Sequence, residues 1–350
     1  MMHSGCYQRV SKFNSFSVKT GYDSSISYSY KFTIGYVCFR GDMDIDIISS
    51  MIFLAIRAGT PLLLVALGEL VCEKSGVLNL GQEGMMLLGA VSGFVIAYES
   101  GSAFFGLIAA ATTGIVAALV FAVIVLQFFA NQVAAGLALT IFGFGLSSFL
   151  GAGYIGKSVD GIPSWNFFGL SEIPFFGNIF FSHDPMVYLA LTVCPILYWF
   201  VYRTHAGLVL RAVGESPETA SRMGINVLIV RYCSIMFGGA MAGLGGAYLS
   251  LVVTPLWADG MTAGRGWIAL ALVVFASWRI GRLLFGAYLF GLMGILNLAL
   301  QSIGVSTSPN LLASLPYVVT IIALIMLSKN RQGSMLNIPL SLGKPFHFLN

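Results

Sequence analysis

The sequence predicts an all-α protein that crosses a membrane about eight or nine times. Only 9% of its 350 residues are charged and 57% are hydrophobic, whereas a soluble domain carries about 25% charged residues. Apolar stretches follow one another along the chain, and most reach the roughly 17 to 25 residues that cross a bilayer. Because so few charges cannot cover a water-facing surface, the composition excludes an ordinary soluble enzyme, a disulfide scaffold and a disordered chain.

The chain divides into a short tail, a transmembrane domain and a second tail. Residues 1–43 are rich in Ser and Tyr and contain no apolar run long enough for a signal peptide. Two interpretations of this segment remain open: it serves a partner or targeting, or the start codon is placed too early and Met43 is the natural start, which we favour. The transmembrane domain is predicted over 44–330 and a cytoplasmic tail over 331–350.

The apolar stretches give the order of the spans. The stretch 266–278 is too short for a comfortable crossing and is predicted to be tilted, broken or re-entrant. A broken helix is predicted near 68–84, where polar residues and glycines interrupt the apolar pattern. The spans are predicted over 48–71, 78–98, 103–127, 131–150, 185–202, 232–254, 266–278, 282–300 and 311–327.

Arginine placement predicts the orientation, since cytoplasmic loops are enriched in Lys and Arg. The loop 203–231 holds four arginines and is therefore predicted to be the cytoplasmic loop of the domain. Counting backward places the loop 151–184 outside, and it also places the start of the first helix outside. Arg57 does not support that last assignment. We expect the number of membrane crossings to be uncertain at the interrupted stretch 68–84, because a broken helix there changes the alternation of sides.

That interrupted stretch is the first candidate site. Charged groups inside a membrane are costly unless they face protein, water or a partner, and unwound backbone there lines protein or a cavity. For Glu73 and Lys74 we expect a solvated loop. For Asn79 and Glu83 a functional role and a structural role remain equally open.

The cytoplasmic loop predicts a short helix of its own. Pro217 after Ser216 is typical of a helix start, and Gly224 is a plausible stop. Thr219, Ala220 and Met223 are expected to share one short face. The helix is interpreted as a knob for a cytoplasmic partner or, alternatively, as an amphipathic helix that lies on the bilayer.

Two later stretches are rich in glycine. Small residues spaced four apart at Gly239, Gly243 and Ala247 predict a helix that packs closely on its neighbours. The stretch 257–267 places Asp259 and Arg265 among glycines between two tryptophans. Its tryptophans are interpreted as interface anchors or as an aromatic wall for a flat or sugar-like solute.

Other apparent signals are rejected. Residues 151–158 fit a phosphate-loop pattern, but that chemistry needs a strand before the loop and a helix after it. Here an apolar span precedes the pattern, and 159–163 cannot begin a helix. The five cysteines lack metal-ligand spacing. We therefore expect no metal, no bound cofactor, no catalytic residue and no nucleic-acid partner for this chain.

Several blocks together resemble one family. GELVCEKSGVLNLGQEGMMLLGA, NQVAAGLALTIFGFGLSSFLG, LRAVGESPETASRMGIN, GGAMAGLGGAYLSL, GMTAGRGWIALALVVFASW and LLASLPYVVTIIALI occur in this order. They resemble the permease subunit of ABC importers of the nucleoside and simple-sugar type, distantly related to branched-chain amino acid permeases. The resemblance covers about residues 52–328. It does not cover the first 43 residues, and Cys72-Glu73-Lys74 departs slightly from the usual Ser/Thr-Glu-Arg.

The resemblance implies a multi-pass subunit of the plasma or inner membrane, surrounded by lipid, without ATPase activity of its own. It implies ATP-binding ATPase subunits, a second permease subunit and an extracytoplasmic solute-binding lipoprotein as partners. Residues 218–224 match the family's coupling helix, so ATPase contact is predicted for Arg211, Glu215, Glu218, Thr219, Ala220 and Gly224. The block 79–83 matches the signature at the family's translocation path. The substrate path is predicted at Asn79, Gln82, Glu83, Asn131 and Gln132, with Thr262 and Arg265 as outside candidates.

The predicted function is ATP-driven import of nucleosides, with a simple sugar as the alternative solute. A rival from another class is a secondary transporter driven by an ion gradient, which needs acidic residues inside several spans. The spans 185–202, 232–254 and 282–327 contain none. A membrane-embedded enzyme is weaker still, since no span carries a His or a paired-carboxylate constellation.

Overall fold

Helices make up most of the described structure. This computed structural model describes residues 42–165, 176–302 and 338–344, together with single positions at 314, 318, 321, 322 and 325. Within these residues the only extended pairing is a pair of isolated bridges, Ile155 with Trp257 and Ser158 with Leu256. Residues 1–41 of the predicted tail and most of the predicted span 311–327 lie outside the described residues, whereas Asp42 and Met43 begin the first helix.

The helices follow the predicted apolar stretches closely. Within the described residues, five segments are long and apolar enough to cross a membrane: Ser49–Lys74, Ala103–Leu126, Gln132–Tyr154, Pro185–Arg203 and Val227–Val253. The prediction of an all-α polytopic membrane protein is confirmed. The five segments correspond to α1 (Asp42–Lys74), α3 (Ala103–Leu126), α4 (Gln132–Gly151), α6 (Pro185–Arg203) and α9 (Val227–Tyr248). The bundle also contains α2 (Gln82–Ser100), α10 (Arg265–Phe275) and α11 (Ile280–Ser302).

Side-chain caps fix where several helices begin. Asn131 accepts hydrogen bonds from the backbone N–H groups of Val133 and Ala134 at the start of α4, and Asn226 accepts one from Ile229 at the start of α9. Asp184 does the same at α6, where Pro185 occupies the first turn. Such caps satisfy N–H groups that have no acceptor inside the helix.

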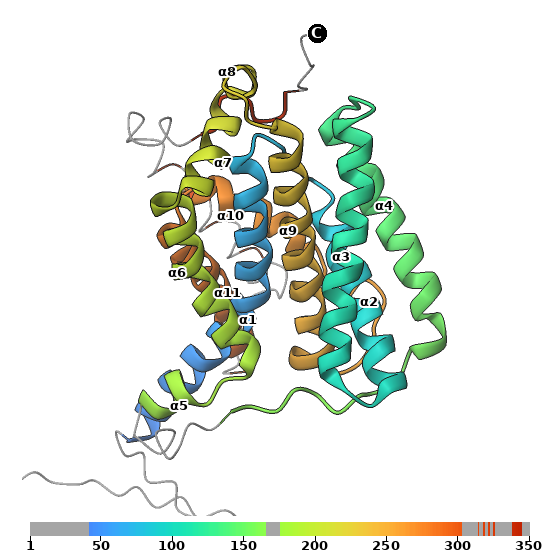
Figure 1. Cartoon of the computed structure of the whole chain (residues 1–350). Coiled ribbons are helices and arrows are strands. Elements are labelled where there is room, and N and C mark those ends of the chain that lie inside the picture. The colour runs from blue at the N-terminus through green and yellow to red at the C-terminus, as the bar shows by residue number, and fades with distance from the viewer. Residues whose placement is uncertain are drawn as a thin grey trace, which may run out of the picture. The chain divides into compact units, whose positions relative to one another are not determined.

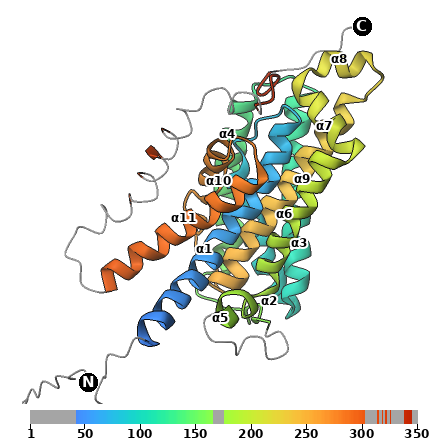
Figure 2. The ribbon, with the colours of Figure 1, turned by 90° about the vertical axis from the view of Figure 1, so that its left-hand side faces the viewer.

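The helices cross between two ends of the bundle, marked by α8 (Pro217–Arg222) and α5 (Phe176–Phe181). Figure 1 shows α1, α3 and α6 running toward the α8 end and α4 and α9 running back toward the α5 end. Figure 2 shows that α11 also runs back toward the α5 end. By the bounds of their helices, the ends of α1 and α6 and the starts of α9 and α11 that point to the α8 end, together with α7 and α8, carry the basic residues Lys74, Arg203, Arg211, Arg222, Arg231, Arg279 and Arg282. This asymmetry indicates that the α8 end is cytoplasmic.

The start of α1 lies at the end opposite α8, which the arginine distribution predicts to be extracytoplasmic. Arg57 no longer argues against this assignment, because its charge has a partner. Its Nε lies 3.8 Å from Asp184 Oδ2, and its Nη2 donates to the Val252 carbonyl over 3.0 Å. Tyr248 also donates to Asp184 Oδ2, over 3.0 Å. An arginine in the middle of a helix that is paired inside the bundle differs from the unpaired loop arginines on which the orientation rule rests.

Helix α9 is the centre of the bundle and depends on its glycines. A Cβ added at Gly243 would stand 2.1 Å from the Ala110 carbonyl oxygen of α3, and one at Gly246 would stand 1.9 Å from the Met86 carbonyl oxygen of α2. Backbones this close require residues without a side chain. The prediction of a close-packing helix is confirmed, and Figure 1 shows α9 beside α1 and α3.

Replacing Gly246 with Val is expected to destabilise the fold by about 3 kcal/mol or more, since the clash is with backbone and cannot be relieved by a rotamer change. The measurement is thermal unfolding of the detergent-solubilised protein. Gly145→Val is the matched control, because nothing lies within 4 Å of a Cβ at Gly145 of α4. Equal unfolding temperatures for the two variants would contradict this account of α9.

Candidate functional site

The chain between α1 and α2 turns back into the bundle. Helix α1 continues without a break to Lys74, and the non-helical residues 75–81 lead to α2. The break therefore lies inside the predicted interval 68–84. The expectation of a solvated loop for Glu73 and Lys74 is wrong: both lie on α1, and their exposed fractions are 0% and 6%. The Trp278 indole N–H donates to Glu73, so the carboxylate joins α1 to the turn after α10.

Glu69, which the sequence analysis did not select, organises residues 75–82. Its side chain is fully buried. One carboxylate oxygen accepts from the Asn79 backbone N–H over 3.0 Å, and the other accepts from the Gln82 side-chain amide. Asn79 in turn accepts from the Gly81 N–H over 2.9 Å. Glu69 thus binds the returning backbone to α1, as a buried carboxylate must be satisfied by donors.

Glu83, in the first turn of α2, binds the start of another helix. Its carboxylate accepts from the Thr262 hydroxyl, from the Gly264 N–H over 2.8 Å and from the Gly266 N–H over 2.6 Å. These donors lie at the N-terminus of α10. A carboxylate is stabilised there both by the free N–H groups and by the helix dipole. We call Glu83 with Thr262, Gly264 and Gly266 the α10 clamp.

Helix α10 is a half-length crossing that begins inside the bundle. Its 11 residues span about 16 Å, from the α10 clamp to the turn at Trp278. Residues 254–264 precede it as non-helical chain. The prediction of a broken or re-entrant piece at 266–278 is confirmed. Gly266 makes the contact possible, since a Cβ there would stand 2.6 Å from the Glu83 backbone.

The predicted path residues fall into two groups. Asn79, Gln82, Glu83 and Thr262 form one polar cluster where α1, α2 and α10 meet, and each is at most 1% exposed. Arg265 lies beside this cluster and donates to the Met261 and Thr262 carbonyls over 3.0 and 3.3 Å. Their role in a substrate path stays a prediction. Most of their polar groups bond to other groups of the protein here, whereas Gln82 Oε1 is buried without a hydrogen-bond partner among the described residues.

Asn131 and Gln132 lie elsewhere, at the cytoplasmic start of α4. Asn131 is exposed and caps its helix. Gln132 is buried; its Oε1 accepts from the Leu78 N–H over 2.8 Å, and its amide donates to the Lys344 carbonyl over 3.4 Å. Gln132 thus ties α4 to residues 75–81 at the cytoplasmic surface, away from the α10 clamp.

The cytoplasmic loop forms two helices, α7 (His205–Glu215) and α8. The Ser216 hydroxyl accepts from the Thr219 N–H over 3.3 Å, which confirms the predicted start. Gly224 ends the helix with φ +83°. The prediction that Thr219, Ala220 and Met223 share one face is wrong. Ala220 is buried against Val213 and Val227, whereas Met223 is 76% exposed.

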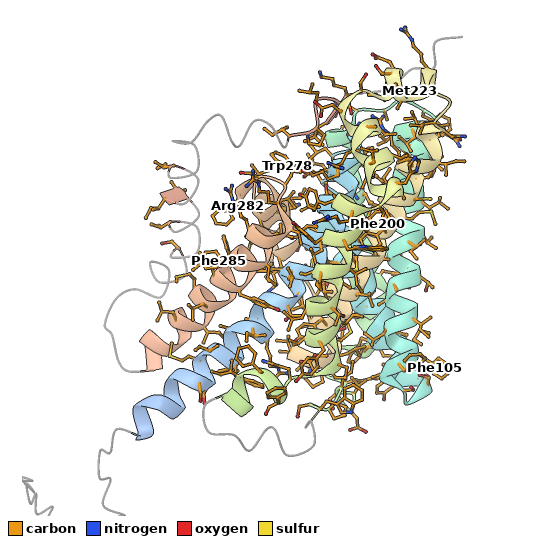
Figure 3. The ribbon with its side chains drawn as sticks, turned by 60° about the vertical axis from the view of Figure 1, so that its left-hand side comes forward. Phe105, Phe200, Met223, Trp278, Arg282 and Phe285 are labelled. Atoms are coloured by element: carbon orange, nitrogen blue, oxygen red, sulfur yellow. The ribbon has the colours of Figure 1, made fainter. Side chains whose placement is uncertain are left out.

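The exposed side of α8 therefore consists of Glu218, Thr219, Arg222 and Met223. Met223 projects beyond the bundle in Figure 3. Ala220 seats the helix on α7 and α9 and is not available to a partner. Of the other predicted contact residues, Glu215 is exposed, while Arg211 is half-buried and lies over the Tyr202 ring, 5.7 Å from its centroid.

A tight joint connects α7 to the end of α1. A Cβ at Gly214 would stand 2.1 Å from the Lys74 carbonyl oxygen. Gly214 also accepts from the Ser341 N–H and hydroxyl, over 3.1 and 2.6 Å. Buried Arg231 of α9 donates to the Ser75 carbonyl over 3.2 Å and to the Ser341 hydroxyl over 3.4 Å. We call Lys74, Gly214, Arg231 and Ser341 the α1–α7 joint.

The structure around the phosphate-loop pattern at 151–158 agrees with the sequence analysis, which expected an apolar span before the pattern and no helix after it. Helix α4 precedes it, a 3₁₀ turn covers Ala152–Tyr154, and 159–165 are not helical. The segment lies at the extracytoplasmic end, where Val159 N–H donates to the Pro255 carbonyl over 3.1 Å.

Comparison with known proteins identifies the family. Residues 51–327 match the family described as branched-chain amino acid transport system, permease component. The chain belongs to this permease family. Membership makes it a multi-pass membrane protein and a transport permease of an ABC system with ATPase and solute-binding partners.

Several curated relatives are similar over most of their length. The putative glucose ABC transporter permease TsgC13 of Haloferax volcanii is 46% identical over 73% of this chain and 79% of its own. The guanosine permease NupQ of Bacillus subtilis is 33% identical over 81% of this chain and 93% of its own. The nucleoside permease NupC of Lactococcus lactis is 32% identical over 76% and 88%. No solved structure is significantly similar to the chain.

Proposed function

We propose that this permease imports a nucleoside, in a complex with ATPase subunits that bind ATP, a second permease subunit and an extracytoplasmic solute-binding lipoprotein. One observation carries the coupling part of the proposal. The exposed helix α8 follows α7, and α7 is packed backbone to backbone on α1 at Gly214. Movement of α8 on an ATPase therefore reaches the membrane helices without an intervening flexible side chain.

The route from that joint leads to the proposed path. Helix α1 carries Glu69 and Glu73 one turn apart, and these bind residues 79–82 and Trp278 respectively. Displacement of the C-terminal end of α1 would thus move two segments together: residues 75–81, which precede α2, and the turn at Trp278, which follows α10. The α10 clamp lies between these two points. We propose that opening and closing around the clamp exposes Asn79, Gln82, Glu83, Thr262 and Arg265 to solute.

A simple sugar is the second candidate solute. Relatives named for guanosine and nucleosides support the nucleoside, and the 46% identical relative named for glucose supports the sugar. The test is uptake of labelled uridine and, separately, of ribose and glucose into cells with and without this chain, with its partner subunits co-expressed. Uptake of uridine that is lost with the chain and competed by adenosine is expected. If cells without this chain lose only the uptake of ribose or glucose, the imported solute is a simple sugar.

Glu218→Lys is expected to weaken association with the ATPase at least about tenfold, because it reverses a charge on the exposed side of α8. The measurement is co-purification of the ATPase subunits and their ATP-driven solute uptake. Asp160→Lys reverses an exposed charge at the extracytoplasmic end and is the matched control. If Glu218→Lys binds the ATPase as tightly as the control does, α8 is not the coupling helix.

A further inference from the structure

A cavity at the cytoplasmic end of the bundle lies apart from both the α10 clamp and α8. It has a volume of about 480 Å³ and is lined by Tyr198 and Tyr202 of α6 and by the turn and first residues of α11: Arg279, Ile280, Gly281 and Arg282. A third guanidinium, that of Arg211, lies over the Tyr202 ring at 5.7 Å. We propose that this cavity binds the phosphate group of an anionic phospholipid from the cytoplasmic leaflet. We call it the α6–α11 cavity.

The chemistry of the lining favours a phosphate. Arg279 and Arg282 are exposed, and no ion pair or side-chain hydrogen bond joins either of them to another described residue. The nearby carboxylate of Glu73 already accepts from the Trp278 indole N–H. Arginine binds phosphate oxygens in a bidentate manner, and the two tyrosine hydroxyls supply further donors.

The backbone adds a second, independent element. Helix α11 has 23 residues and begins at Ile280, so its first turn opens onto the cavity. The first N–H groups of a helix have no acceptor inside it and attract phosphate together with the helix dipole. Gly281 keeps this turn accessible, because nothing lies within 4 Å of the position of a Cβ there.

The surroundings favour a lipid over a soluble anion. Trp199 of α6 and Phe285 of α11 are 62% and 66% exposed. In Figure 3, Arg282 and Phe285 point to the same side of α11, and Arg282 lies nearer the end that carries Met223. A headgroup at the arginines would thus place its acyl chains along exposed apolar side chains. Basic pockets between helices on the cytoplasmic side are the usual form of such sites.

The test uses the full chain assembled with its partner subunits in detergent. Dioctanoyl phosphatidylglycerol, dioctanoyl phosphatidylcholine and glycerol phosphate are titrated separately, and bound adducts are counted by native mass spectrometry. Saturable binding of phosphatidylglycerol is expected. The double variant Arg279→Gln, Arg282→Gln should bind it about 30-fold more weakly, at roughly a fivefold effect for each arginine near an anionic surface. Arg203→Gln, an exposed arginine outside the cavity, should bind as the unsubstituted protein does.

Three results would overturn the proposal. Equal binding of phosphatidylcholine and phosphatidylglycerol would show that the cavity does not select an anionic headgroup. Equal binding of glycerol phosphate and phosphatidylglycerol would make the ligand a soluble phosphate. An unchanged affinity of the double variant would place the bound lipid elsewhere. The unfolding temperature and co-purification with the partner subunits check that the double variant is folded. The proposal does not depend on the imported solute, so failure of the uptake experiment leaves it intact.

Discussion

Glu83→Ala is expected to remove the α10 clamp and to abolish uptake. The substitution leaves the Thr262 hydroxyl and the Gly264 and Gly266 N–H groups without their acceptor in a region at most about half exposed to solvent. An orphaned buried donor costs about 1–3 kcal/mol, so a loss of about 3–5 kcal/mol in the free energy of unfolding is expected. The measurement combines thermal unfolding in detergent with solute uptake in the assembled complex.

The matched control for this prediction is Glu99→Ala, at the other end of the same helix. Glu99 is exposed and accepts from the Tyr154 hydroxyl over 2.9 Å, so its removal should change stability by less than about 1 kcal/mol. Glu83→Gln retains one acceptor oxygen and should fall between the two. If Glu83→Ala and Glu99→Ala unfold at the same temperature, the carboxylate does not hold α10 in place.

Gly214→Val is expected to separate α7 from α1 and thereby uncouple ATP hydrolysis from transport. The Cβ of a valine at this position would stand 2.1 Å from the Lys74 carbonyl oxygen. Because the clash is between backbone segments, a change of side-chain rotamer cannot relieve it. The exposed residues of α8 are untouched, so the ATPase should still bind. Uptake should fall at least about tenfold while ATP hydrolysis continues, since a contact displaced by about 1 Å disrupts a precise geometry. Both rates are measured on one reconstituted preparation.

Ala206→Val is the control on the same helix, because Ala206 is exposed and makes no such contact. It should leave uptake and hydrolysis coupled. A Gly214→Val complex that transports at the normal ratio of solute to ATP would show that the α1–α7 joint does not transmit the movement of α8.

Most of the fold could be predicted because membrane helices are recognised in a sequence by their length and hydropathy. The spans at 103–127 and 185–202 agree with α3 and α6 within one residue at each end. The close packing of α9 was also predictable, because small residues four apart have few other uses in a membrane. Helix α8 was predictable from Ser216 and Pro217, which act locally.

The errors arise where partners are distant in sequence. Glu73 and Lys74 look like loop residues, yet the partner that buries Glu73 is Trp278, 205 positions away. Glu69 bonds residues 10 and 13 positions later, across a chain reversal that no periodicity reveals. The pairing of Arg57 with Asp184 is equally hidden. A glutamate inside an apolar run was the one available signal for Glu69, since such a charge needs a partner.

The inward side of α8 shows a different limit. A six-residue helix has too few turns for its pattern to decide which side is buried. Ala220 faces inward because α7 and α9 supply Val213 and Val227, and the position of those helices is a tertiary property. Asn131 and Gln132 were predicted to line the path, and their part in it stays a prediction; at the start of α4 they serve as a cap and as a tie to Leu78.

The central claim is that this chain transports only as part of an ATP-driven complex. The most direct measurement is uptake of labelled nucleoside and sugar into proteoliposomes that contain the chain with its permease, ATPase and binding-protein partners. The same uptake is measured with the ATPase omitted or made unable to hydrolyse ATP. The account predicts uptake that requires hydrolysis and disappears in both controls. Uptake by this chain without an ATPase, driven by an ion gradient, would contradict it and establish a secondary transporter.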